Sequence, residues 1–314
     1  MSASADVQLA GSATRPSTRL DTLRHYRHLT LELAISQFKL RYTQSVLGYF
    51  WSLLKPAMVF AITYFIFVDL FDIKDGTDFY GIQLLLGIVV WTFFAECTAS
   101  SMQAIASNAA LIRKTYFPRS ILVIAASMSS LFTFLINLTL VALIAVLLHQ
   151  IDFGLRMLVV IPLLVELYFL VLGISLFLSA LFVQYHDVGH IWEVLMQLLF
   201  YGSGVMFSLT YVLQRAGLAH RPGTAPTAPH FLWAAQLLAA NPIMQIIEDL
   251  RHALVTPVAP WTASVVTGHL VALGQTHPLH ASLLLPVPFL LVLLIFAGGA
   301  LTFRSRARTF AEDL

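Results

Sequence analysis

The chain alternates between long apolar runs and short polar stretches. Six of the runs have the length of about 20 mostly apolar residues that a helix needs to cross the hydrocarbon core of a bilayer. We place these predicted spans at Val46–Leu70, Tyr80–Ile105, Ile121–Leu148, Met157–Val183, Ile191–Leu213 and Ser282–Phe303. The pattern therefore predicts an all-α integral membrane protein with six transmembrane helices.

Two shorter apolar runs lie between the last two predicted spans. Phe231–Ala240 and Ile243–Leu254 are joined by Asn241-Pro242, and the second run contains Arg251. Runs of this length are more often re-entrant or interfacial than spanning. We expect a re-entrant helix pair with its hinge at Asn241 and Pro242, inside a longer extracellular region at residues 211–281.

The amino-terminal part has a different pattern. Residues 1–19 are rich in Ser, Ala and Thr and predict a disordered tail. Residues 20–44 repeat apolar side chains near helical spacing, which predicts an amphipathic helix lying in the headgroup layer. Its basic residues would face anionic phosphate there, although a simple surface anchor would show the same pattern; they are Arg24, Arg27, Lys39 and Arg41.

Composition supports the membrane assignment. Hydrophobic residues make up 58% of the chain and charged residues only 11%, against about 25% charged residues in soluble domains. The single cysteine, Cys97, excludes an intramolecular disulfide and a cysteine-based metal cluster. We expect no metal site and no cofactor, and we interpret His186 and His190 as interfacial residues.

The basic residues predict the orientation. Thirteen of the 18 lysines and arginines fall on the side that contains both termini, and the other five fall on the opposite side. The positive-inside rule therefore places both termini in the cytoplasm, with residues 304–314 as a cytoplasmic tail, and we expect a multi-pass protein of the bacterial inner (plasma) membrane. Gln184–His190 should also be cytoplasmic, although it contains no lysine or arginine.

A basic and aromatic stretch, residues 107–120, separates the second and third predicted spans. Asn108 could cap a short surface helix there, and Pro118 could start the next helix. The stretch is either an ordinary positive-inside loop or a docking helix that passes force from a cytoplasmic partner into the membrane. The residues that would carry this coupling are Arg113, Lys114, Thr115, Tyr116, Phe117, Pro118 and Arg119.

The chain offers little chemistry of its own. No G-x-x-x-x-G-K-[ST] phosphate loop occurs in the sequence, so we expect no ATP hydrolysis by this chain and do not expect an enzyme. Glu96 and Glu166 lie inside predicted spans, where a carboxylate is either functional or hydrogen-bonded to a neighbouring helix. We favour the second role, with Asn137 or Tyr168 as partners. Lys55 should extend toward the cytoplasmic headgroups.

Four blocks of the sequence resemble one family. They are Lys39-Leu40-Arg41-Tyr42-Thr43-Gln44-Ser45-Val46-Leu47-Gly48-Tyr49-Phe50-Trp51-Ser52-Leu53-Leu54-Lys55-Pro56, then Lys114-Thr115-Tyr116-Phe117-Pro118-Arg119, then Asn241-Pro242-Ile243 with the following Arg251, and the ending Phe303-Arg304 through Phe310-Ala311-Glu312-Asp313-Leu314. Together they are similar to ABC-2 type permeases that export polysaccharides and teichoic acids, with residues 45–303 as the transmembrane domain. Relatives usually carry an arginine where this chain has His186 before Asp187.

The resemblance implies partners and a substrate. It implies a homodimer joined to two copies of a nucleotide-binding ATPase subunit, which binds ATP and Mg, and no nucleic-acid partner. The cargo would be a lipid-linked polysaccharide such as an O-antigen, a capsule or a teichoic acid. The alternatives are an ABC-2 exporter of a small hydrophobic compound, a membrane-embedded transferase, or a secondary transporter, for which the sequence shows no inverted repeat.

The resemblance also implies roles for the residues singled out above. The basic residues of segment 20–44 would form a gate for the lipid phosphate, and the 107–120 stretch would be held by the ATPase. The hinged pair would cap the exit. Aromatic rings that could stack on sugars would line the channel: Tyr49, Trp51, Trp91, Phe93, Phe94 and Tyr201.

Overall fold

The computed structural model describes residues 19–43, 48, 50–70, 80–114, 117–149, 155–208, 237–238, 240–255 and 287–307. Within these ranges every regular element is helical and no strand occurs. The predicted all-α class is confirmed for this part of the chain. Five of the helices are long and apolar enough to cross a membrane.

These five helices match five of the six predicted spans. The first is α2 (Phe50–Tyr64), which continues into the π-helical turn η2 (Phe65–Leu70). The next two are α3 (Tyr80–Gln103) and α5 (Ser120–Leu147). The fourth runs from the 3₁₀ turn η4 (Leu155–Val159) into α6 (Val160–Phe182), and the last is α13 (Val287–Arg306).

The remaining prediction, one continuous helix over Ile191–Leu213, is wrong in its bounds, because α7 (Val188–Gly202) ends after 15 residues. The chain leaves the helix in a turn at Gly204, whose φ of 72° is readily adopted only by glycine. Tyr80 Oη then donates a hydrogen bond of 2.7 Å to the Met206 carbonyl, so the turn is fixed to α3.

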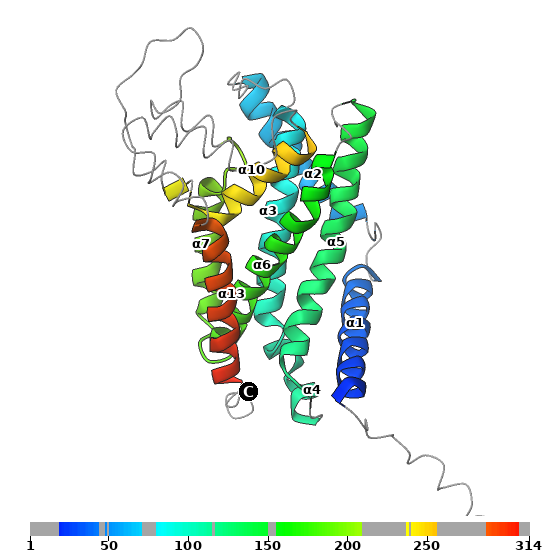
Figure 1. Ribbon diagram of the computed structural model, residues 1–314, viewed down its shortest axis with the longest axis vertical. Helices are drawn as coiled ribbons and strands as arrows, with labels where there is room; N and C mark the ends of the chain where they lie inside the picture. The colour runs from blue at the N-terminus through cyan, green and yellow to red at the C-terminus, as the bar shows by residue number, and fades with distance from the viewer. Residues whose placement is uncertain are drawn as a thin grey trace, which may run out of the picture.

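Helix α3 is the centre of the bundle. It is the most buried of the five apolar helices and contacts α2, α5, α6, α7 and α10 (Pro242–Leu254). Its rings contribute to these contacts, since Phe93 stacks on Phe134 of α5 at 4.6 Å between ring centroids. The other large interface joins α6 to α13, and Figure 1 shows these two helices crossing along most of their length.

Helix α1 (Arg19–Thr43) lies differently from our expectation. We expected it to lie in the headgroup layer, and in the structure it packs lengthwise beside the lower half of α5, as Figure 1 shows. Phe38 contacts Phe132 of α5 at 6.0 Å between ring centroids. The apolar side chains do not gather on one covered face, because Leu31, Ile35 and Leu40 stay exposed.

One end of the bundle gathers the predicted cytoplasmic segments. The start of α1, the end of α13 and the short helix α4 (Ala109–Lys114) all lie at the lower end in Figure 1. Helix α10 crosses the bundle near the opposite end. The start of α1, the end of α13 and α4 therefore share one end of the bundle, and which side of the membrane that end faces stays a prediction.

Helix α10 occupies the second predicted limb, Ile243–Leu254, and begins at Pro242 as expected. It contacts α3, α6 and α13, and nearly all of its side chains are buried, including polar ones. Residues 231–236 of the first limb lie outside the described residues. The depth of this pair in the membrane therefore stays a prediction.

Candidate functional site

The basic stretch 107–120 forms a compact projection at one end of the bundle. A 3₁₀ turn (Ala106–Asn108) leads into α4, whose Arg113 and Lys114 side chains are exposed. We expected Asn108 to cap α4, but its side-chain amide instead donates a hydrogen bond back to the Ala104 carbonyl at 2.8 Å. Thr115 and Tyr116 lie outside the described residues.

Three side chains of the stretch attach this projection to the bundle. Phe117 packs against the small buried cluster of Ala104, Leu122 and Ala126, and Ile112 packs there too. The Arg119 guanidinium donates a hydrogen bond to the Ala307 carbonyl at the end of α13. Pro118 is exposed at the start of α5, where its carbonyl accepts from Ile121 N at 3.0 Å. The stretch 107–120 is therefore in contact with both α5 and the end of α13.

The turn between α6 and α7 receives its positive charge from another segment. Residues Gln184–His190 have no lysine or arginine, but Arg306 at the end of α13 donates a hydrogen bond to the Gln184 side chain. His186 lies on the Phe182 ring, with 5.3 Å between ring centroids. Arg306 of α13 therefore brings to Gln184–His190 the positive charge that the positive-inside rule predicts for a cytoplasmic segment.

A polar cluster lies where α1, α2, α3 and α5 meet. Lys55 Nζ is 2.9 Å from Glu96 Oε1, and Arg41 Nη2 is 3.5 Å from Ser130 Oγ. Ser130 in turn lies 3.2 Å from Ser100 Oγ, one helical turn after Glu96 on α3. We call these five residues the Arg41–Lys55 cluster. It places two cations and one carboxylate close together, contributed by α1, α2 and α3.

Sequence reasoning missed this cluster. We expected Lys55 to extend to the headgroups and Glu96 to bond a polar residue such as Asn137 or Tyr168. Glu96 instead pairs with Lys55, and Tyr168 bonds Ser127 at 3.0 Å. The contact joins residues 41 positions apart on two helices, so no local pattern indicates it.

The four predicted gate residues do not share one layer. All four are exposed, but α1 rises 1.5 Å per residue, so Arg27 and Lys39 lie roughly 18 Å apart along its axis. Arg24 and Arg27 belong to the first turns of α1, whose start lies at the end of the bundle that also contains α4. Arg41 contacts Ser130, which lies about 15 Å along α5 from its start. The basic residues therefore form two groups at different depths.

The predicted channel aromatics are also divided. Trp91, Phe93 and Phe94 are buried in the core of the single chain, where Trp91 contacts Phe94 and Phe200. Trp51 and Tyr201 are exposed, at 49% and 66% of their surface. Tyr49 lies outside the described residues. Of the five predicted channel aromatics that the structure describes, only Trp51 and Tyr201 are exposed.

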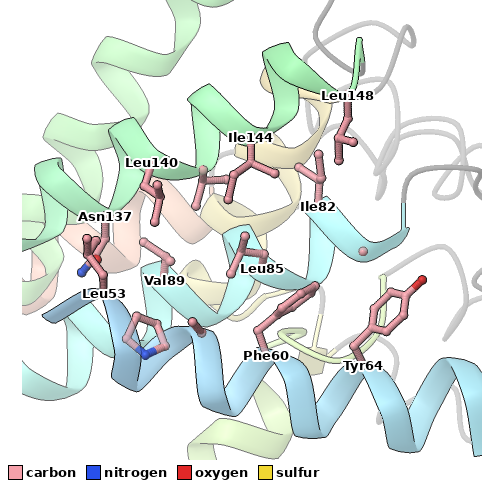
Figure 2. Close-up of a pocket in the computed structure, with 14 residues that line it drawn as sticks. Leu53, Phe60, Tyr64, Ile82, Leu85, Val89, Asn137, Leu140, Ile144 and Leu148 are labelled. Carbon is pink, nitrogen blue, oxygen red and sulfur yellow. The ribbon is translucent and has the colours of Figure 1, made fainter. Parts of the chain in front are cut away.

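A cavity of about 420 Å³ lies between α2, α3 and α5. Figure 2 shows Phe60 and Tyr64 directed from α2 toward α3, with Asn137 of α5 at one end and Leu148 at the other. The lining is apolar except for the Asn137 amide and the Tyr64 hydroxyl. Such a surface suits a hydrocarbon chain better than a sugar.

The predicted hinge is a capped helix start. The Asn241 side chain accepts a hydrogen bond from Ile243 N at 3.0 Å, and its amide nitrogen donates to the Gly202 carbonyl at 2.9 Å. Pro242 occupies the first helical turn, where a missing N–H costs nothing. Asn241 therefore fixes the start of α10 against the end of α7.

Arg251 connects α10 to two other parts of the bundle. Its guanidinium donates to the carbonyls of Gln83 at 3.1 Å and Val205 at 2.7 Å, and it lies 3.3 Å from Glu248 Oε2. Gly87 makes room for it, because a Cβ there would be 2.9 Å from Arg251 Nη2. The buried Arg251 donates hydrogen bonds to several backbone carbonyl groups, and it therefore stabilises the non-helical turn that follows α7.

Glu248 completes this buried network. Burial would raise the pKa of its carboxyl, but His252 and Arg251 offset that effect and lower the pKa below its ordinary value. Sequence reasoning identified Arg251 but missed its neighbours Gln245, Glu248 and Asp249. The signal available in the sequence was their concentration in a 13-residue helix directly after Asn241-Pro242.

Comparisons with known proteins agree with this architecture. The family model for the ABC-2 type transporter matches residues 28–215. The chain is 24% identical over 250 residues to the O-antigen export system permease protein RfbA of Myxococcus xanthus, covering 78% of this chain and 93% of that protein. It is 34% identical over 94 residues to the protein of the same name from Klebsiella pneumoniae, where the match spans 30% of this chain and 36% of the relative. The chain belongs to the ABC-2 type transporter family, whose membrane domain has no nucleotide-binding site of its own.

Proposed function

We propose that this chain is the membrane subunit of an ATP-driven exporter that moves a lipid-linked polysaccharide from the cytoplasm to the outer face of the inner membrane. The observation that carries the proposal is the match along 78% of the chain to a permease named for O-antigen export. O-antigens, capsules and teichoic acids are the polysaccharides in this class. ATP and Mg would be bound by a separate ATPase subunit, in two copies.

The projection that contains α4 supports the coupling part of the proposal. Arg113 and Lys114 are exposed, while Phe117 and Arg119 hold the projection to α5 and α13. A subunit that grips α4 would therefore move two long helices together. This is the geometry that a coupling segment requires.

The basic residues of α1 support a path for a phosphorylated lipid. Arg24 and Arg27 belong to the first turns of α1, which starts at the α4 end, and Arg41 and Lys55 belong to the Arg41–Lys55 cluster farther along the bundle. A lipid phosphate would meet the first group at the membrane surface and the second after it moves inward. Lys39 lies close to Arg41 on the same helix and would contribute to the second group.

Exposed apolar surface supports the expected homodimer. No residue of α7 is buried, although Leu198 and Tyr201 are large and each is 66% exposed. Trp51 and Ile62 of α2 are exposed as well. A second copy that covers these helices would enclose a channel with Trp51 and Tyr201 on its wall; Tyr49, Trp91, Phe93 and Phe94 would join them as the bundle opens.

Deletion and complementation in the source bacterium test the proposal. Without this chain, surface polysaccharide should disappear and lipid-linked glycan should accumulate on the cytoplasmic side; the wild-type gene should reverse both effects. Unchanged surface polysaccharide would reject the proposal. Increased sensitivity to hydrophobic compounds, with normal polysaccharide, would favour a small-molecule exporter, the alternative that the apolar cavity between α2, α3 and α5 supports.

A further inference from the structure

The cavity of about 420 Å³ between α2, α3 and α5 has the length of an extended chain. Asn137 of α5 lies at one end of this cavity and Leu148 lies at the other, as Figure 2 shows. Helix α5 rises 1.5 Å per residue, so the two positions are about 16 Å apart along its axis. The space is therefore too long to be a site for a single ion.

Asn137 brings a polar atom without a partner into this cavity. Its side chain lines the cavity and is only 5% exposed. Its Oδ1 atom is buried and accepts no hydrogen bond within the described part of the chain. The side chains beside it in Figure 2, Leu53, Val89 and Leu140, contain no hydrogen-bonding group. Burial of a carboxamide oxygen without a partner is unfavourable, so Oδ1 calls for a donor that enters the cavity.

Water does not meet this need. A buried water is held by two to four polar partners, and apolar cavities otherwise stay dry. The other polar group of the described lining is the Tyr64 hydroxyl, which lies toward the opposite end of the cavity from Asn137 in Figure 2. One water cannot bridge these two groups. The donor at Asn137 therefore belongs to a larger molecule whose remaining surface is apolar.

The position of Asn137 excludes a charged or bulky head group. On α5 it lies about 25 Å from Ser120 and about 15 Å from Leu147, inside a helix that is apolar and long enough to cross a membrane. A phospholipid keeps its head group at the interface and would bring only hydrocarbon to this depth. The described lining also contains no charged side chain to pair with an ion. The donor must then be a small neutral group.

We propose that this cavity binds a long-chain alcohol, with its hydroxyl group at Asn137 and its hydrocarbon chain directed toward Leu148. A hydroxyl both donates and accepts, so it can pair with Oδ1 and with the amide nitrogen of the same side chain. The chain would bury apolar surface against all three helices, at residues such as Phe60, Leu85 and Ile144.

The site is independent of the proposed export route. No residue of the coupling stretch or of the Arg41–Lys55 cluster belongs to the described lining. Pro56, however, lines the cavity and directly follows Lys55 on α2. A bound alcohol would therefore fix α2 against α3 and α5 next to that cluster.

Photolabelling of the purified full-length protein in nanodiscs tests the proposal. The label is a dodecanol analogue with a diazirine in its chain, and the competitors are 1-dodecanol and dodecane. Labelling should map to the lining of the cavity, and 1-dodecanol should compete about tenfold more effectively than dodecane, because one hydrogen bond contributes roughly this factor. Equal competition by the two compounds would overturn the assignment of a hydroxyl. Labelling that neither compound reduces would overturn the site itself.

Asn137→Leu removes the carboxamide with little change in volume. It should reduce the competition by 1-dodecanol to the level of dodecane, and it should raise the Tm of the ligand-free protein, because a buried polar atom without a partner is lost. Thr139→Val changes an exposed position of the same helix and should alter neither result. A variant Asn137→Leu that keeps the preference for the alcohol would overturn the proposal. A large fall in its Tm would do so too, since Asn137 would then bond within the protein.

A second variant keeps the test decisive if Asn137→Leu folds poorly. Ala57→Phe adds a ring at an exposed position of the lining and should abolish the labelling of the cavity. Met58→Phe adds a ring at the next residue, which is exposed and outside the described lining, and should retain the labelling. Labelling of the cavity that survives Ala57→Phe would overturn the proposal.

Discussion

Lys55 and Glu96 form an ion pair of 2.9 Å between two apolar helices, α2 and α3. The pair is asymmetric, because the Lys55 side chain is 64% exposed and Glu96 is 30% exposed. Glu96 thus holds a cation at the open surface of the bundle, near the level at which Arg41 contacts Ser130. The ion pair therefore fixes the position of Lys55, which belongs to the deeper group of basic residues on the proposed phosphate path.

Removing the carboxylate should affect export more than stability. For Glu96→Gln we expect a loss of about 0.5–1 kcal/mol, since partly exposed pairs contribute little, and a fall in Tm of about 2 °C. Surface polysaccharide should fall several-fold, because Lys55 is no longer positioned. The double exchange Lys55→Glu with Glu96→Lys should restore the Tm, and a double variant no more stable than Glu96→Gln would argue against a specific pair.

Arg251 should be essential for assembly of the end of the bundle that contains α10. Arg251→Met leaves Glu248 without a guanidinium and removes the donor to the Gln83 and Val205 carbonyls, at a cost of about 3–5 kcal/mol. Folded protein, measured by size-exclusion chromatography, should largely disappear. Arg251→Lys should rescue only part of it, because an ammonium cannot reproduce the fork of donors. Normal yield of Arg251→Met would contradict the structural role.

The crossing of α6 and α13 depends on two glycines. A Cβ at Gly299 would lie 2.0 Å from the Gly173 carbonyl oxygen, and one at Gly173 would lie 2.5 Å from Phe296 Cα. Backbone atoms cannot give way locally, so Gly299→Ala should force the helices apart and lower the Tm by several degrees. Gly298→Ala is the matched control, because nothing lies within 4 Å of its Cβ position. Similar unfolding curves for the two variants would contradict the close packing.

The coupling projection can be tested by charge reversal. Arg113→Glu with Lys114→Glu should reduce co-purification of the ATPase subunit at least tenfold, while membrane insertion stays normal. Arg304→Glu reverses an exposed charge at the same end of the bundle and should retain the ATPase. Full retention by the double variant would show that 107–120 is only a positive-inside loop.

The buried Glu248 predicts a loss of stability in acid. Its pKa is lower in the folded protein than the ordinary value of 4.5. The charged form is therefore favoured by folding, and its contribution is present above pH 4.5 and is lost as the pH falls through the folded-state pKa. Glu248→Gln should flatten the Tm-against-pH curve below 4.5. A variant that follows the wild-type curve would assign the acid sensitivity to other groups.

The helices that the sequence predicted correctly are those that show a strong local signal. Five apolar runs of sufficient length became helices close to the expected bounds, and Asn241-Pro242 marked the start of α10. The error at Ile191–Leu213 has a physical reason. Apolar residues such as Val205 are buried by α10 and Arg251, so their hydropathy reports burial in protein rather than in lipid.

The candidate site could be predicted only in part. A short basic segment between apolar runs predicts that Arg113 and Lys114 are exposed. The same pattern does not predict that Phe117 attaches the segment to the bundle. The Arg41–Lys55 cluster, the Arg306–Gln184 contact and the hydrogen bonds of Arg251 all join segments far apart in the sequence. Such contacts are set by helix packing, which no single segment encodes.

The most direct test of the proposed function is ATP hydrolysis by the assembled transporter. This chain, co-purified with the ATPase subunit of the same cells and placed in nanodiscs, is assayed with and without their lipid-linked polysaccharide. The account predicts stable co-purification and turnover that rises when the lipid-linked polysaccharide is added. Failure to bind any ATPase subunit, or turnover indifferent to the polysaccharide, would contradict it.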